Sequence, residues 1–287
     1  MDKFYVITNR QKDKDFHITR EIQEFIEENG KTCILSEKDC DGYIIPESIP
    51  RKMDCGIVLG GDGTLIRAAR ELKNYNIPLL GINLGTLGYL TEVELQDYKE
   101  ALTDLFQKEP VIEERMMMTG DISGPDPAGT PTADRLGNTA MNDIVVTRDG
   151  ALRVVRFNIY VNGELLNNYE ADGVIISTPT GTTGYNLSAG GPIVEPTASM
   201  FVITPICSHA LNTSSIVLSS EDVIEIEIAA GKYDTIEHAS VTFDGADTVP
   251  LVTGNKVSVR KAEETTKLVK LSRESFMKTM RSKMKGN

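Results

Sequence analysis

The residues with the clearest chemical potential form a glycine-rich stretch, Gly60-Gly61-Asp62-Gly63-Thr64. This stretch follows the apolar residues 57–59 and precedes an amphipathic segment, residues 65–72, so we expect a buried strand, a tight turn and a helix. Glycines let a ligand approach the backbone closely, and the N–H groups in the first turn of a helix attract anions. The simplest ligand for such a turn is a phosphate.

Asp62 is unusual in an anion-binding turn because a carboxylate repels a phosphate. The carboxylate makes chemical sense if it binds a divalent metal or accepts a proton from an attacking hydroxyl. A purely structural alternative is that Asp62 caps the N-terminus of the following helix. The stretch alone leaves these interpretations open.

A second unusual segment covers residues 172–192, where an apolar strand leads into a loop dense in glycines and small hydroxyl side chains. Neutral donors and acceptors suit an uncharged, hydroxyl-rich ligand such as a nucleoside, and Tyr185 offers a flat surface for ring stacking. The alternative is an ordinary turn between strands. The hydroxyl side chains concerned are Thr180, Thr182, Thr183 and Ser188.

Three further polar residues stand next to predicted strands. Asn142 and Asp143 precede the strand 144–147, and Arg153 begins another strand. Taken alone, the pair is typical of a turn and the arginine of a surface charge.

Composition and charge limit the classes of protein and partner. With 287 residues, 40% hydrophobic and 25% charged, the chain is typical of a soluble globular protein of two domains. The net charge of −12 argues against nucleic acid or an anionic membrane surface as a partner. No run is long enough for a signal peptide or a membrane span, so we expect a cytoplasmic protein. We expect reduced, mostly buried thiols and no structural zinc, because no C-x-x-C pair occurs among Cys33, Cys40, Cys55 and Cys207.

The first hundred residues alternate between short apolar runs and amphipathic segments. Strands are predicted at 4–7, 32–35, 56–59 and 77–82, and helices at 17–28, 65–73 and 95–106. This alternation predicts a Rossmann-like parallel α/β domain, in which ligands bind at the carboxyl ends of the strands. The glycine turn lies at one such end, and the loop 83–89, which includes Tyr89, lies at the next.

After residue 108 the pattern changes to short strands. They are predicted at 112–122, 144–147, 154–161, 216–218, 223–228, 241–243 and 257–259, with a hairpin turn at Asn162-Gly163 and a mobile loop at 124–137. Residues 267–285 have helical spacing and are expected to form a helix that returns to the first domain. We therefore predict an α/β domain of residues 1–107 plus 267–287 and an all-β, β-sandwich-like domain of residues 108–266.

Taken together, these motifs resemble the ATP-dependent NAD kinase family. The glycine stretch resembles its G-G-D-G-T loop, Asn142-Asp143 its Asn-Asp/Glu pair, and residues 172–192 its long D-G-x-x-x-x-T-P-T-G-S-T-A-Y signature. Residues 204–211 resemble a T-P-I-C-x-H-x-L stretch, and Phe243-Asp244-Gly245 a late D-G strand. The glycine loop is shared with lipid kinases, whereas the long signature is specific to NAD kinases.

The resemblance implies transfer of the γ-phosphoryl group of ATP, or in some members of polyphosphate, to the 2′-hydroxyl on the adenosine ribose of NAD. It implies a divalent metal such as Mg2+, without identifying the ligands, and a homodimer or homotetramer whose site lies between the two domains. Asp62 is then the expected catalytic base, with Gly60, Gly61, Gly63 and Thr64 as the phosphate loop. The dinucleotide contacts carried over are Asp62, Gly63, Tyr89, Asn142, Asp143, Arg153, Asp172, Thr180, Thr183, Gly184, Tyr185, Asn186, Leu187 and Ser188.

The chain departs from the family pattern at a few positions. Thr182 and Gly184 replace the usual Ser and Ala, residues 212–215 lack a frequent Arg, and Ala246 replaces a common Gln. These changes bear on ligand affinity or on the choice of phosphoryl donor more than on the type of reaction. Two alternative functions remain. A lipid or sphingoid-base kinase would need an apolar or basic acceptor site, and a non-catalytic NAD(H) or NADP(H) binding protein would have no use for Asp62.

Overall fold

The computed structural model describes residues 1–85, 88–125, 138–150, 154–209, 214–246, 248–271 and 276–284. The chain divides into two compact units, Met1–Arg115 with Thr265–Asn287, and Met116–Glu264. Each unit has its own hydrophobic core. Two long strands, β6 (Val111–Ser123) and β17 (Lys256–Lys270), belong partly to each unit. Within the described ranges, no helix is both long and apolar enough to cross a membrane.

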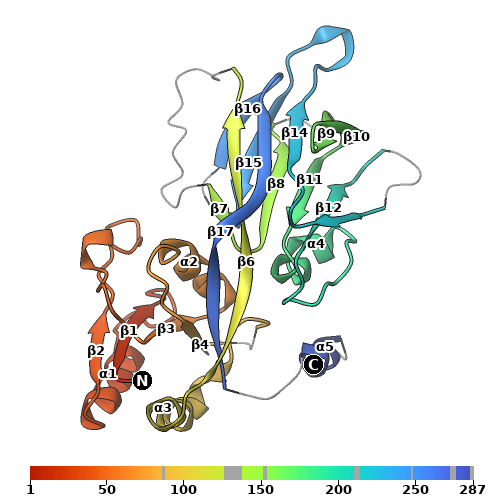
Figure 1. The fold of residues 1–287 in the computed structure, drawn as a ribbon. Helices are drawn as coiled ribbons and strands as arrows, with labels where there is room; N and C mark the ends of the chain where they lie inside the picture. Colours follow the sequence, from red (N-terminus) through yellow and green to blue (C-terminus); the bar gives the residue numbers. More distant parts are fainter. Residues whose placement is uncertain are drawn as a thin grey trace. The chain divides into compact units, whose positions relative to one another are not determined.

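The first unit is built on a parallel sheet with strand order β2-β1-β3-β4 (Figure 1). The short strand β5 and the end of β17 also pair in parallel with β4. This arrangement confirms the predicted parallel α/β fold. The strands are β1 (Lys3–Thr8), β2 (Thr32–Leu35), β3 (Cys55–Gly60), β4 (Leu79–Asn83) and β5 (Val93–Glu94), and the helices are α1 (His17–Glu28), α2 (Asp62–Glu71) and α3 (Tyr98–Gln107), with 3-10 turns at Pro46–Ser48 and Leu95–Asp97.

The sheet places the candidate residues of the first unit at one edge. All six residues of β3 are buried, as expected for a central parallel strand covered on both faces. Because β1, β3 and β4 are parallel neighbours, their carboxyl ends at Thr8, Gly60 and Asn83 meet at the same edge. The amphipathic face of α1 packs on the core through Ile22 and Ile26, which are fully buried.

The second unit contains two antiparallel sheets around one core, which confirms the predicted β-sandwich-like fold. One sheet has the order β13-β12-β11-β8-β15-β16, and the other contains β10-β9-β14-β17 (Figure 1). The short strand β7 pairs with β6. The remaining bounds are β7 (Thr139–Ala140), β8 (Asp143–Arg148), β9 (Val155–Val161), β10 (Glu164–Ala171), β11 (Gly173–Ser177), β12 (Met200–Ile206), β13 (Ile216–Ser219), β14 (Ile224–Ile228), β15 (His238–Phe243) and β16 (Thr248–Val252), with 3-10 turns at Thr180–Thr183 and Lys232–Asp234 and a short helix α4 (Tyr185–Ser188).

Two local predictions in the second unit, the strand at 223–228 and the hairpin turn at Asn162-Gly163, are confirmed. In β14 the isoleucines are buried and the two glutamates between them are not, so the strict alternation marks a strand with one core face. Asn162 and Gly163 join β9 to β10 with φ values of 52° and 82°. Positive φ at both positions is the requirement of a type I′ hairpin turn.

Some expectations were wrong. Within the described part of residues 267–285, the helix is α5 (Phe276–Met284), and the residues up to Lys270 continue β17 instead of forming a helix. Cys40 and Cys207 are exposed and Cys33 is partly so, which leaves Cys55 as the one buried thiol and contradicts the expectation of mostly buried cysteines. All four cysteines are free, as predicted. The loop predicted at 124–137 lies almost entirely outside the described residues.

Candidate active site

The glycine turn joins β3 to α2 as the sequence predicts, and its geometry explains the glycines. A side chain at Gly60 would collide with Thr64, so the strand can enter this turn only without one. Thr64 Oγ1 accepts a hydrogen bond from Asn9 Nδ2 at 2.9 Å, which links the turn to the loop after β1. At Gly63 no atom lies within 4 Å of where a Cβ would be, so this position faces open space. The N-cap is Gly61, which rules out the N-cap interpretation of Asp62.

Asp62 begins α2, and its carboxylate binds the loop that follows β4. Oδ2 accepts the backbone N–H of Tyr89 at 2.6 Å, and Oδ1 accepts those of Leu90 and Thr91, both at 3.1 Å. Gly88 makes this approach possible, because a side chain there would overlap the carboxylate. An ionised carboxylate can accept about four hydrogen bonds, so Oδ2 retains the capacity to accept one from a ligand.

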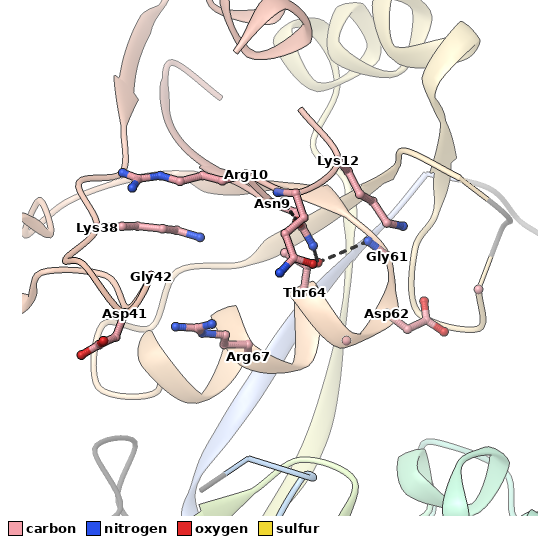
Figure 2. Close-up of a pocket in the computed structure, with 13 residues that line it drawn as sticks. Asn9, Arg10, Lys12, Lys38, Asp41, Gly42, Gly61, Asp62, Thr64 and Arg67 are labelled. Carbon is pink, nitrogen blue, oxygen red and sulfur yellow. Dashed lines mark hydrogen bonds between the residues drawn. The ribbon is translucent and has the colours of Figure 1, made fainter. Parts of the chain in front are cut away.

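A cavity of about 670 Å3 opens beside this turn within the first unit. All of its lining side chains are polar or glycine, and four of them are cationic: Arg10, Lys12, Lys38 and Arg67. Figure 2 shows Lys12 directed toward Gly61, whereas Arg10, Lys38 and Arg67 gather at the other end of the cavity. A cavity with this lining suits a polyanion. No sequence motif pointed to these cations, because they come from separate loops and from one helix.

Lys12 occupies a particular place in this cavity. Its Nζ lies 3.2 Å from the Cβ position of Gly61 and 3.3 Å from that of Gly85, so the ammonium sits between the glycine turn and the loop after β4. The loop that carries Lys12 is held at both ends. The backbone N–H of Asn9 donates to Leu59 O at 2.8 Å, and Asp13 accepts the Thr19 hydroxyl at 2.6 Å.

The other end of the cavity contains a partly buried charge network. Arg67 Nε donates to Glu71 Oε1 at 3.1 Å, and its guanidinium stacks 4.1 Å above the centroid of the Tyr43 ring. Lys38 Nζ donates to the carbonyl of Thr8 at 2.9 Å. Burial lowers the pKa of Lys38 and raises that of Glu71, because it disfavours the charged form of each. An anion in the cavity would compensate the burial of these cations.

In the second unit, the structure brings Asn142 together with the loop that follows β11. A side chain at Gly181 would overlap the backbone of Asn142, and Asn142 Nδ2 lies 3.5 Å from the Cβ position of Gly184. Asn142 Oδ1 is buried without a hydrogen-bond partner in the described structure. Asp143 is buried, and its burial together with the nearby charge of Asp244 raises its pKa to about 7.

The loop residues differ in how accessible they are. Tyr185 and Leu187 are 45% and 40% exposed, and Ser188 is also exposed. Asn186 is fully buried, where its Nδ2 donates to Pro192 O at 2.9 Å and its Oδ1 accepts from Thr204 at 2.6 Å. The Asn186 side chain therefore holds the loop together. Thr180 is buried, whereas Thr183 and Gly184 are partly exposed.

Asp172 lies between β10 and β11 and pairs with Arg148, whose Nε is 2.9 Å from Asp172 Oδ1. It also lines a second cavity, of about 710 Å3, together with Glu170, Arg156 and His209. Arg153 lies outside the described residues. No group of three or more His, Cys, Asp or Glu side chains in the described ranges is arranged to hold a metal ion.

Comparisons with known proteins assign the chain to a family. Residues 39–110 match the ATP-NAD kinase N-terminal domain, and residues 141–271 match the ATP-NAD kinase C-terminal domain. The chain is 45% identical over 285 residues to the NAD kinase of Lachnoclostridium phytofermentans, and the match covers 99% of each chain. This chain belongs to the NAD kinase family. The predicted resemblance is thereby confirmed, and with it the expectation of an enzyme.

Other NAD kinases agree in sequence and in fold. The NAD kinase of Lachnospira eligens is 42% identical, over 99% of this chain and 100% of its own. An Archaeoglobus fulgidus NAD kinase crystallised with ATP has a TM-score of 0.76 and 25% identity, over 98% of each chain. Yeast NADH kinase complexed with NADH has a TM-score of 0.84 over 100% of this chain and 88% of its own, and at 21% identity it supports the fold alone.

Proposed function

We propose that this protein is an NAD kinase, which transfers the γ-phosphoryl group of ATP to the 2′-hydroxyl of the adenosine ribose of NAD and forms NADP. The observation that carries the proposal is the position of Asp62, whose Oδ2 can still accept a hydrogen bond beside a cavity lined by four cations. Membership of the NAD kinase family supports it independently.

In the proposed reaction, a bond forms between the ribose 2′-oxygen and the γ-phosphorus of ATP, and the bond from this phosphorus to the bridging β–γ oxygen breaks. ADP leaves, and Asp62 Oδ2 accepts the proton of the hydroxyl. A ribose hydroxyl is a weak nucleophile, so a positioned base contributes about 10²–10⁴-fold to such a rate. Most of the remaining catalysis in phosphoryl transfer comes from positioning and charge stabilisation.

The cations and the glycine turn supply that stabilisation in the proposal. Lys12, between the glycine turn and the loop after β4, is suited to the phosphate nearest Asp62. The backbone of Gly60, Gly61, Gly63 and Thr64 forms the phosphate loop. The other three cations are suited to the rest of the phosphate chain, in ATP or in polyphosphate.

We assign the divalent metal, such as Mg2+, to the substrate. The described residues do not form a protein cage for a metal. Mg2+ commonly binds through substrate phosphates with only one or two carboxylates. The carboxylates near the cavity are therefore compatible with a metal ion that enters the site already bound to the phosphates of ATP.

The dinucleotide contacts in this proposal are Asp62, Gly63 and Tyr89 in the first unit and Asn142, Asp143, Arg153, Asp172, Thr180, Thr183, Gly184, Tyr185, Asn186, Leu187 and Ser188 in the second. Tyr185 offers an exposed ring for stacking. Asn186 would contribute through its backbone, since its side chain is buried and bonded within the loop. We further propose that the enzyme acts in the cytoplasm as a homodimer or homotetramer.

The test is an incubation of the purified protein with NAD, magnesium and ATP radiolabelled at its γ-phosphate. We expect the label in a product that an NADP-specific dehydrogenase reduces. A protein that binds NAD but transfers no label, from ATP or from polyphosphate, would be a non-catalytic dinucleotide-binding protein. Label in a lipid or sphingoid base, and none in NADP, would identify the lipid-kinase alternative.

A further inference from the structure

Asp244 lies in the turn after β15 and binds a segment about a hundred residues earlier in the chain. Its carboxylate accepts three backbone N–H groups, those of Met141 at 2.8 Å, Asn142 at 2.7 Å and Asp143 at 3.0 Å. The backbone N–H of Asp244 donates in return to Asp143 O at 2.9 Å. Asp244 has a φ of 54°, in the left-handed region that is uncommon for a residue other than glycine. The turn thus accepts an unfavourable conformation to make these contacts.

The opposite side of the same segment is held by Thr178. Its Oγ1 donates to Met141 O at 2.6 Å, and its backbone N–H donates to Asn142 O at 2.9 Å. Backbone groups of residues 141–143 therefore bind Asp244 on one side and the start of the hydroxyl-rich loop on the other. Because these backbone groups are all hydrogen-bonded, the backbone of residues 141–143 cannot rotate without losing several hydrogen bonds.

The segment fixed in this way carries two side chains that are available to a ligand. Asn142 Oδ1 is buried and has no partner among the described residues, and Asn142 Nδ2 lies next to Gly184. Asp143 is 6% exposed. Its electrostatic neighbours are the carboxylate of Asp244 and the phenol of Tyr185. A buried amide and a buried carboxyl that pair with no cation in the described part of the chain can discriminate strongly between ligands.

We propose that Asp244 is a positioning residue for dinucleotide binding, whose carboxylate orients Asn142 and Asp143 by binding the backbone of residues 141–143. This inference rests on the proposed function, in which those two residues contact NAD. Asp244 itself need not touch the substrate. Its negative charge has a second effect, because it lies beside Asp143 and disfavours ionisation of that carboxyl.

The test compares Asp244→Asn with Asp222→Asn. Asparagine has the same shape as aspartate, but its Nδ2 would face at least one backbone N–H of residues 141–143. Both groups are hydrogen-bond donors, so at least one hydrogen bond to the segment would be lost. Asp222 is a matched control in the same unit, since it also accepts a backbone N–H, from Ser219 at 3.0 Å, in a turn outside the proposed site. We expect Asp244→Asn to raise the Kd and KM for NAD by about tenfold or more, with the KM for ATP within about twofold of wild type. Asp222→Asn should leave all three unchanged.

The pH dependence of NAD binding separates positioning from a merely structural role. Burial and the charge of Asp244 together raise the pKa of Asp143 to about 7, so the wild-type KM for NAD should change across neutral pH. In Asp244→Asn this change should move to lower pH, because one of its two causes is gone, and in Asp143→Asn it should vanish. An unchanged Kd and KM for NAD with an unchanged pH profile, whatever the loss of melting temperature, would overturn the inference. The Kd for NAD is measured without phosphoryl transfer, so it tests this inference separately from the proposed function. If the wild type had no kinase activity but Asp244→Asn still weakened NAD binding, the proposed function would be refuted and this inference would stand.

Discussion

Replacement of Asp143 by Asn should stabilise the protein at neutral and alkaline pH. The pKa of the Asp143 carboxyl rises from 3.8 to about 7, through burial and through the charge of Asp244. A carboxyl whose pKa is raised on folding contributes its stability fully below pH ~4 and loses it as the pH rises through ~7. A shift of about three units corresponds to about 4 kcal/mol at ~1.4 kcal/mol per unit. Asparagine has no such dependence, because it remains neutral.

The assay is urea unfolding of both proteins, followed by circular dichroism, at several pH values between 5 and 8. The useful quantity is the difference in free energy of unfolding between variant and wild type, because other titrating groups cancel from it. We expect this difference to grow in favour of Asp143→Asn by about 2–3 kcal/mol from pH 5 to pH 8 and then to level off. A difference that stays constant over this range would refute the reasoning.

Glu227→Gln provides a control of opposite sign in the same unit. Burial works to raise the pKa of Glu227, but hydrogen bonds from Asn158 and Tyr160 and the charge of Lys256 outweigh it, and the net pKa is lowered. This variant should therefore be less stable than wild type above pH ~4.5, and the difference should shrink as the pH falls through the lowered pKa.

Two further predictions concern the first unit. Lys12→Gln should raise the KM for ATP and lower kcat, together by about tenfold or more, because one cation is lost beside the phosphate loop. The Kd for NAD should stay constant. Steady-state kinetics checks this, with Lys14→Gln at an exposed position as the control. If Lys12→Gln had the same KM for ATP as Lys14→Gln, Lys12 would not contribute to ATP binding. Gly88→Ala should reduce kcat strongly without a comparable loss of melting temperature, because its methyl group would displace the loop bound to the Asp62 carboxylate. Full activity in this variant would show that the contact between Asp62 and the loop has no role in the reaction.

Much of the fold could be predicted because local sequence patterns determine it. The alternation of apolar and amphipathic segments predicted the parallel sheet, and α1 spans residues 17–28 as expected. Two strands of the second unit show the limit of such patterns. β10 is an edge strand with six of its eight residues exposed, so it lacks the apolar alternation that marks a strand. β17 continues beyond the predicted strand 257–259, through a highly charged stretch, to Lys270. Its last four residues were predicted as the start of a helix because residues 267–285 have helical spacing.

The candidate site was predictable where its chemistry lies in one contiguous motif. The glycine turn and the loop after β11 could be located from residue types and spacing. The contacts of Asp62 with Tyr89–Thr91 and of Asp244 with Met141–Asp143 could not, because they join segments about 30 and 100 residues apart. The four cations of the first cavity were missed for the same reason. Their common location depends on which strand ends are neighbours.

The central claim is that Asp62 accepts the proton of the NAD 2′-hydroxyl during phosphoryl transfer. The most direct measurement is NADP formation by wild type, Asp62→Asn and the control Asp104→Asn, a partly exposed position on α3, together with the Kd of each for NAD. We expect Asp62→Asn to lose about 10²–10⁴-fold in NADP formation with little change in the Kd for NAD, and Asp104→Asn to match wild type. An Asp62→Asn enzyme within about tenfold of wild type, a difference near 1.4 kcal/mol, would contradict the claim.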